Sequence, residues 1–261
     1  MVTDQDLVAL SDAGYHELDL EIVRRSGGEV EESDGMLHVA GTHDAPFIVN
    51  GSMRTDIAVP PRVAIASARA WAARRGRVAS ISTHAQDVDL DTALEAASWD
   101  REVELPGMIA VDQIDEVEPG PGVRLEAVRT ERDLRTLIEV LGESFGPEEP
   151  WPGLWASVFG DLSTIDHADT TCVLAYADDQ PAAAAVSYAL EPVGIVGMVG
   201  TISRLARRGL GNLVTRHVAA SAQRHNGRAV VLQSSPMAQP LYERIGFRAV
   251  TRYRIWVDST G

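Results

Sequence analysis

The second half of the chain alternates apolar runs with helical periodicities in an order that predicts a mixed α/β (α+β) fold. The clearest helical pattern covers residues 134–141, where leucine or isoleucine recurs every three or four residues behind a capping Thr130. Residues 172–177 and 182–190 are apolar runs separated by a short polar turn, which is typical of a β-hairpin. Over residues 123–257 the predicted order of elements is β-α-α-β-β-β-α-β-α-β.

The first half of the chain repeats much of this order with weaker signals. Its helical patterns fall at residues 4–12, 15–25, 61–75 and 90–97. Its apolar runs predict strands at residues 36–40, 46–50, 78–83, 102–105 and 108–112. Two similar halves indicate a diverged internal duplication, and an unrelated α+β unit is the alternative interpretation.

A change of composition separates the two halves at residues 113–122, which read QIDEVEPGPG. Proline and glycine in close succession interrupt helices and strands, so we interpret this segment as a linker. We therefore expect an N-terminal domain over residues 1–112 and a C-terminal domain over residues 123–261.

The segment with the clearest chemistry is Val199–Asn212, which reads VGTISRLARRGLGN. A predicted strand runs into Arg207, Arg208 and a Gly-Leu-Gly turn, and an amphipathic helix follows. The first amides of a helix have no intrahelical acceptor, and the helix dipole adds partial positive charge there. Glycine also lets a ligand approach the backbone closely. The segment therefore predicts a pyrophosphate site, and a glycine-rich turn with solvent-facing arginines is the alternative.

Two motifs of the second half resemble the GNAT family of acyl-CoA-dependent N-acetyltransferases. Gly209 and Gly211 match the family pattern [Arg/Gln]-x-x-Gly-x-[Gly/Ala], although its first position is Ala206 here. The sequence AQPLYERIGF at residues 238–247 is similar to the family signature A-x-x-L-Y-x-x-x-G-F, and Ser235 stands where the family often has asparagine. The resemblance implies a GNAT fold, with a mixed central sheet flanked by helices, preceded by a diverged GNAT-like half.

The resemblance further implies that the second half binds acetyl-CoA as a co-substrate. The pantetheine arm would lie between the fourth and fifth strands and pair with the backbone of Val199 and Thr201. The first half has no glycine-rich segment before its helix at residues 61–75, so one cofactor per chain is expected. The residues implied in binding are Val199, Gly200, Thr201, Arg207, Arg208, Gly209, Leu210, Gly211, Asn212, Ser235 and Tyr242.

The same resemblance implies direct attack of an amine on the thioester, without a covalent enzyme intermediate. Tyr242 occupies the position of a general acid that helps the thiolate to leave. The predicted strand at residues 193–201 contains no carboxylate, so Glu191, just before it, is our candidate for the general base. A base relayed by water, or no base at all, is the alternative.

Several other side chains have two interpretations. Trp151 and Trp155 line an acceptor pocket or pack between helices. His217 lies on the apolar side of its predicted helix and is expected in the core. Cys172 lies in an apolar run and is expected to pack there. No His or Cys cluster has the spacing of metal ligands, so no metal site is expected. Three acidic residues also have two interpretations: they cover the acceptor site or are solvated loop charges. These residues are Glu143, Glu148 and Glu149.

The formal net charge is −15, and every basic residue other than histidine is arginine. This charge disfavours nucleic acid as a partner, and it either attracts cationic acceptors or only keeps the protein soluble. No apolar run reaches about 18 residues and the acidic N-terminus does not resemble a secretory signal, so we expect no membrane association. The single cysteine is compatible with the cytoplasm, the location we expect for a monomer or homodimer.

Three functions therefore remain open from the sequence. The first is transfer of an acetyl group from acetyl-CoA to the primary amine of a small molecule. The second is acetylation of a protein or peptide, which would need an open groove instead of an enclosed pocket. The third is a non-catalytic CoA-binding module, which Ala206 and the missing strand carboxylate favour.

Overall fold

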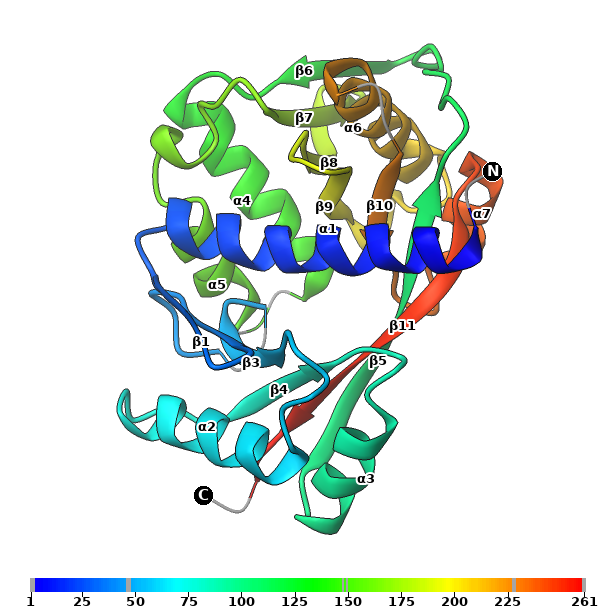
Figure 1. Cartoon of the computed structure of the whole chain (residues 1–261). Helices are drawn as coiled ribbons and strands as arrows, with labels where there is room; N and C mark the ends of the chain where they lie inside the picture. The colour runs from blue at the N-terminus through cyan, green and yellow to red at the C-terminus, as the bar shows by residue number, and fades with distance from the viewer. Residues whose placement is uncertain (1–2, 46–47, 147, 149, 227–228, 260–261) are drawn as a thin grey trace.

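A computed structural model describes residues 3–45, 48–146, 148, 150–226 and 229–259. Within these residues, eleven strands form one mixed sheet in the order β1-β2-β3-β4-β11-β5-β10-β9-β8-β7-β6. Helices cover both faces of this sheet (Figure 1), which confirms the α/β class predicted from the sequence. No helix of the described part of the chain is both long and apolar enough to cross a membrane.

The elements alternate along the chain, and their bounds follow. The strands are β1 (Glu29–Ser33), β2 (Met36–Ala40), β3 (Asn50–Arg54), β4 (Ser80–Thr83), β5 (Asp100–Ala110), β6 (Val123–Ala127), β7 (Thr170–Ala177), β8 (Gln180–Tyr188), β9 (Gly194–Thr201), β10 (Val230–Gln233) and β11 (Arg248–Val257). The α-helices are α1 (Asp4–Arg25), α2 (Pro61–Ala73), α3 (Val88–Ala96), α4 (Glu131–Phe145), α5 (Trp151–Val158), α6 (Leu210–Asn226) and α7 (Gln239–Ile245).

The second half of the sheet is a helix-covered layer with two apolar cores. Strands β6 to β9 pair antiparallel, and β10 joins β9 in parallel. Alternate residues of β7 point to opposite faces, because Cys172 and Leu174 belong to the core that includes α4, whereas Val173 and Ala175 belong to the core that includes α6. The strand period of two therefore places one core on each side of the sheet.

The two halves exchange strands at the centre of the sheet. Strand β5 belongs to the first half in sequence but lies between β10 and β11, and β11 at the end of the chain also pairs with β4. Figure 1 shows β5 and β11 as two long strands that run from one half of the molecule into the other. The predicted linker at residues 113–122 contains no helix or strand, but the strand pairing crosses this boundary in both directions.

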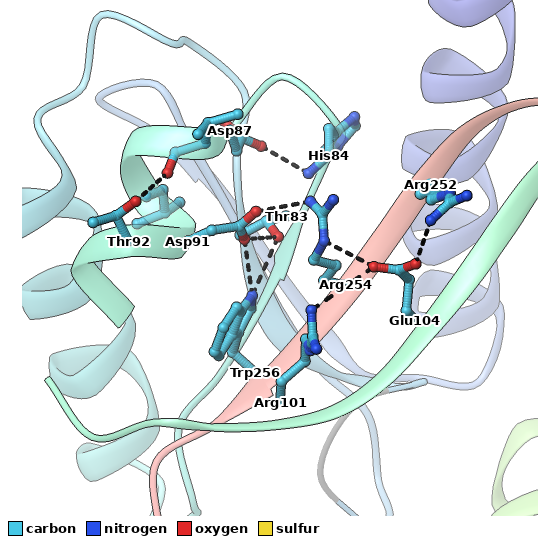
Figure 2. A network of polar contacts seen from close by, with 12 residues as sticks. Thr83, His84, Asp87, Asp91, Thr92, Arg101, Glu104, Arg252, Arg254 and Trp256 are labelled. Atoms are coloured by element: carbon cyan, nitrogen blue, oxygen red, sulfur yellow. Dashed lines mark hydrogen bonds and ion pairs between the residues drawn. The ribbon is translucent and has the colours of Figure 1, made fainter. Parts of the chain in front are cut away.

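Polar contacts reinforce this exchange (Figure 2). Arg254 of β11 donates hydrogen bonds to Asp91 of α3 at 2.7 Å and to Glu104 of β5 at 3.0 Å. The indole of Trp256 donates to the same Asp91 carboxylate at 3.0 Å and packs in the core beneath α2 and α3. The last strand of the chain thus completes the core of the first half.

Helix α1 crosses the middle of the molecule in Figure 1, where it joins the halves. The sequence suggested two helices here, but the structure has one helix of 22 residues, which begins with a capping box between Thr3 and Asp6. Gly14 lies in its middle because a Cβ there would stand 2.4 Å from Cγ2 of Val231 on β10. The glycine therefore permits close packing of α1 on the second half and does not end the helix.

Other local predictions had mixed outcomes. The capping box of α4, between Thr130 and Asp133, is confirmed. The predicted hairpin forms β7 and β8, and Asp178 and Asp179 both take positive φ in its two-residue turn. The strand predicted at residues 46–50 was misplaced: β3 begins at Asn50, and residues 46 and 47 lie outside the described residues. Strand β1 was missed because its residues are charged and mostly exposed.

Candidate functional site

The candidate site begins where β9 and β10 separate. Within the described residues, these parallel strands pair only where Gly194–Val196 of β9 lies beside Val230–Leu232 of β10. From Met198 to Thr201, the described part of the chain offers β9 only β8 as a strand partner. A register shift at Gly197, between Val196 and Met198, marks a bulge at the point of separation. The backbone of residues 198–201 is therefore left without a strand partner on its β10 side.

A tight turn connects β9 to α6. Arg207 and Gly209 take φ values of 64° and 78°, which is the left-handed region that favours glycine. Within the described residues, the backbone amides from Arg207 to Asn212 donate no hydrogen bond to a protein group, whereas the Leu213 amide donates to the Gly209 carbonyl at 3.0 Å. The turn and the first turn of α6 therefore present consecutive free donors at the positive end of the helix dipole.

Arginine side chains add positive charge around this turn. Arg207 and Arg208 are both exposed, and the Arg208 guanidinium donates to the Asp178 carboxylate of the β7–β8 turn at 3.0 Å. Both partners of that ion pair are exposed, so solvent screens it and the arginine can exchange partners at little cost. The arginines can thus contact an anion bound at the turn.

The two sequence motifs meet at the start of α6. A Cβ on Gly211 would stand 3.2 Å from Oγ1 of Thr201 on β9 and 3.5 Å from Cδ2 of Leu241 on α7. Gly211 therefore lets the end of β9, the start of α6 and α7 pack together. Ser235 lies four residues before the start of α7, and its Oγ accepts a hydrogen bond of 3.2 Å from the amide of Ala238, the residue that precedes the helix. Asn212 accepts a hydrogen bond from Arg216, one turn later in α6, at 3.2 Å.

Helix α4 closes the opposite side of β9. A Cβ on Gly200 would lie 2.8 Å from Cβ and Oγ of Ser144, so only glycine permits this approach. No local sequence pattern pointed to Ser144, because its contact with Gly200 joins residues that are 56 positions apart. This contact places the C-terminal end of α4 against the unpaired part of β9.

An aromatic cluster continues from that end of α4. The ring of Phe145, whose residue is 41% exposed, lies 5.0 Å from the ring of Trp155 and 5.4 Å from that of Trp151. Trp155 is buried, and its indole nitrogen has no hydrogen-bond partner in the described part of the chain. The cluster thus combines helix packing with an apolar surface next to β9. Glu143 and Glu148 flank this cluster, and both are exposed. Glu149 lies outside the described residues.

Tyr242 lies on α7, where its ring packs edge-on against Phe247 at 6.1 Å in the same core as the start of α6. Its hydroxyl forms no hydrogen bond with another described residue and is not among the fully buried polar atoms. Burial raises the pKa of the Tyr242 phenol to about 12. The phenol therefore stays protonated at physiological pH and can donate a hydrogen bond.

The structure does not bring Glu191 to these residues. Glu191 is exposed and precedes β9 at its N-terminal end, whereas the turn at Arg207 follows its C-terminal end. The strand has eight residues, which at about 3.3 Å each separates its ends by roughly 25 Å. Glu191 therefore lies at the opposite end of β9 from the turn at Arg207.

Two further expectations have clear outcomes. His217 was expected in the core, but its side chain is 32% exposed and its Nδ1 forms a hydrogen bond of 2.6 Å with Glu116 of the linker segment, so this prediction was wrong. Cys172 is buried and its thiol pKa is raised to about 12 by burial, which agrees with a packing role. Among the described residues, no group of three or more His, Cys, Asp or Glu side chains could hold a metal ion.

The first half lacks the same anion-binding turn. Its parallel pair, β3 and β4, is followed by residues 55–61, which include Asp56, Pro60 and Pro61. Proline has no amide hydrogen, and the Asp56 carboxylate already accepts the Ala58 amide at 2.8 Å. This segment offers neither consecutive donors nor positive charge for a phosphate.

Comparisons with known proteins agree with this geometry. Residues 162–255 match the family described as acetyltransferase (GNAT) domain, and a comparison with curated proteins finds no match. A GCN5-related N-acetyltransferase from Kribbella flavida is similar in structure, with a TM-score of 0.75 and 20% identity, covering 97% of this chain and 96% of that one.

Two further solved structures share the fold. A GCN5-related N-acetyltransferase from Sphaerobacter thermophilus has a TM-score of 0.64 and 15% identity, over 86% of this chain and 76% of that one. A tandem GNAT protein from the clavulanic acid biosynthesis pathway has a TM-score of 0.55 and 16% identity, over 77% of this chain and 70% of that one. Residues 162–255 of this chain therefore match the acetyltransferase (GNAT) domain, and the chain shares its fold with GNAT structures over most of its length.

Proposed function

We propose that this protein transfers an acetyl group from acetyl-CoA to the primary amine of a small molecule. The observation that carries the proposal is the separation of β9 from β10 directly before a turn of free backbone amides. A strand edge without a partner can pair with the amides of an extended pantetheine arm, through Val199 and Thr201. The amides at the start of α6, with Arg207 and Arg208, can bind the pyrophosphate.

The chain's own residues then position two reactants and handle protons. The amine nitrogen forms a bond to the acetyl carbonyl carbon, the carbon–sulfur bond breaks, the amine loses a proton and the thiolate gains one. Tyr242, on the helix that contacts the start of α6, would donate a hydrogen bond to the departing sulfur. We assign no side chain as the base, because Glu191 lies at the wrong end of β9.

The side chains and the helix around the unpaired part of β9 favour a small amine as the acceptor. The exposed Phe145 and its tryptophan neighbours offer an apolar wall, and α1 packs closely over β9 and β10 through Gly14. This cover leaves less room for a polypeptide than an open groove would. Acetylation of a protein, or CoA binding without catalysis, remains the alternative function.

The first test is cofactor binding to the Gly209 turn. Acetyl-CoA at 100 times its Kd stabilises the native state by about 2.7 kcal/mol, which raises the Tm of a protein of this size by roughly 5–10 °C. Gly209→Asp places a carboxylate where the phosphates should bind and should abolish the increase. Gly27→Asp is a matched control, because Gly27 has a φ of 77° and also has open space around its Cβ position.

The second test is acetyl transfer itself, followed as release of free thiol with a panel of small amines and short peptides. Turnover with small amines that is lost in Gly209→Asp and kept in Gly27→Asp is the expected result. Turnover confined to peptides would favour the protein acceptor. Binding of acetyl-CoA without turnover on any acceptor would favour the non-catalytic module.

A further inference from the structure

The first half of the chain contains a cavity of about 630 Å³ that the acetyltransferase site does not use. One wall is α1, which contributes Asp12, His16 and Glu17. The other walls are the residues that follow two neighbouring strands, at 55–57 after β3 and at 84–87 after β4. The volume lies within the range of about 300–1,000 Å³ that is usual for small-molecule sites.

The position of this cavity is one at which ligands commonly bind. Strands β3 and β4 are parallel, with Ser52 paired to Ile81 and Met53 to Ser82, so their carboxyl ends meet at the same edge. In open α/β sheets, ligands bind in the crevice outside the carboxyl ends of parallel strands. In the second half, the corresponding parallel pair β9 and β10 carries the acetyltransferase site.

The charge of the cavity is negative once its internal ion pairs are counted. The one guanidinium of the lining, Arg54, has a fully buried side chain and is 2.6 Å from both the Asp87 and the Asp89 carboxylates. Arg54 and Asp87 are therefore used within the protein. The lining carboxylates left without an arginine partner are those of Asp12, Glu17 and Asp56.

His84 supplies an independent sign of a ligand site. It lines the cavity, its residue is only 7% exposed, and neither ring nitrogen has a hydrogen-bond partner in the described part of the chain. Its Nδ1 is 3.0 Å from Oδ1 of Asp12, close enough for an ion pair but not aligned for a hydrogen bond. Figure 2 shows the side chain pointing away from the contacts of Asp91 and Arg254. Buried polar atoms that lack hydrogen bonds, here both ring nitrogens of His84 and Oδ1 of Asp12, are costly to a fold, so a bound hydrogen-bonding partner would relieve that cost.

The same lining excludes other classes of ligand. Phosphates and carboxylates would meet three carboxylates with no free arginine to compensate them. A metal ion lacks converging donors, because the described residues hold no cluster of three or more His, Cys, Asp and Glu side chains in reach of one ion. The lining carboxylates instead stand on two walls of the cavity, Asp12 and Glu17 on α1 and Asp56 after β3, so a molecule with more than one ammonium group can pair with both walls.

We infer that this cavity is a binding site for a small aliphatic polyamine, held by Asp12, Glu17 and Asp56, with an ammonium group next to His84. The site is distinct from the acetyl-CoA turn, and its occupancy does not depend on acetyl transfer. A neutral imidazole accepts one hydrogen bond from an ammonium, and the Asp12 carboxylate provides the opposite charge.

The test is titration calorimetry of the full chain with spermidine, in the absence of acetyl-CoA. Saturable binding of one spermidine per chain is expected, with glutarate giving no heat of binding. Glu17→Gln should raise the Kd at least about tenfold, since it removes a charge-assisted contact. The Glu17 carboxylate has no hydrogen-bond or ion-pair partner in the described residues, so this variant should keep its unfolding midpoint.

Glu95→Gln is the matched control, because Glu95 is an exposed acid of the first half outside the cavity. Binding lost in Glu17→Gln and kept in Glu95→Gln supports the site. Absence of saturable binding overturns it, and so does equal weakening in both variants, which would indicate attraction to the overall charge of −15. Because acetyl-CoA is absent, failure here is separate from failure of the proposed acetyl transfer.

Discussion

Replacing Tyr242 by phenylalanine removes one hydroxyl and leaves the ring packed against Phe247. Burial weakens this hydroxyl as an acid, since it raises the Tyr242 pKa to about 12. A thiol like that of cysteine has a pKa of about 8.5. Complete proton transfer from the phenol to the thiolate is thus uphill by about 3.5 pKa units, or about 5 kcal/mol.

This difference predicts a hydrogen bond to the thiolate in place of full proton transfer. A hydrogen bond to a charged group contributes about 1.5–3 kcal/mol, so Tyr242→Phe should lower turnover about 10- to 150-fold. Affinity for acetyl-CoA should change little, because the neutral thioester sulfur gains far less from the hydroxyl than the developing thiolate does.

The raised pKa also sets the pH dependence of this effect. A phenol donates only while it is protonated, and the protonated form of Tyr242 persists up to a pH of about 12. An unperturbed tyrosine would lose this ability through a pH of about 10. We therefore expect no alkaline fall of turnover from Tyr242 between pH 8 and 10.

The measurement is single-turnover acetyl transfer at saturating acetyl-CoA, with the Kd of acetyl-CoA determined by calorimetry. Tyr176→Phe on β7 serves as the control, because Tyr176 packs against the core on one face of the sheet and Tyr242 lies in the core on the other. A Tyr242→Phe rate within twofold of the wild type, with chemistry rate-limiting, would refute the reasoning. Equal losses in both variants would indicate a general effect on the fold.

Three further outcomes are expected. Calorimetry should give one acetyl-CoA per chain, and two sites would show that the first half kept a phosphate turn. Arg54→Met leaves two carboxylates without their partner and should lower the unfolding free energy by about 3–5 kcal/mol, against less than about 1 kcal/mol for the exposed Arg24→Met. Gly200→Ala should lower the free energy of unfolding, measured with denaturant, by about 1–3 kcal/mol, and adding Ser144→Gly should restore part of it. If the double variant is no more stable than Gly200→Ala, the contact between these residues is not the cause.

The sequence by itself determined the features that depend on neighbouring residues. The helix at α4 follows from its apolar spacing and the Thr130 cap, and the β7–β8 hairpin from two apolar runs around a polar turn. The Gly-Leu-Gly segment indicated an anion-binding turn because free amides and positive φ are properties of a short stretch of backbone. These features need no information about the rest of the chain.

Only the tertiary structure decided how distant segments combine. The place of β5 between β10 and β11 could not be predicted, because the apolar pattern of a strand does not specify its partner. The sequence indicated two helices, at residues 4–12 and 15–25, whereas the structure has the single helix α1, which packs closely on Val231 of β10 at Gly14. The same is true of the cavity next to His84, whose walls come from three separate segments and meet only because α1 packs across the carboxyl ends of β3 and β4.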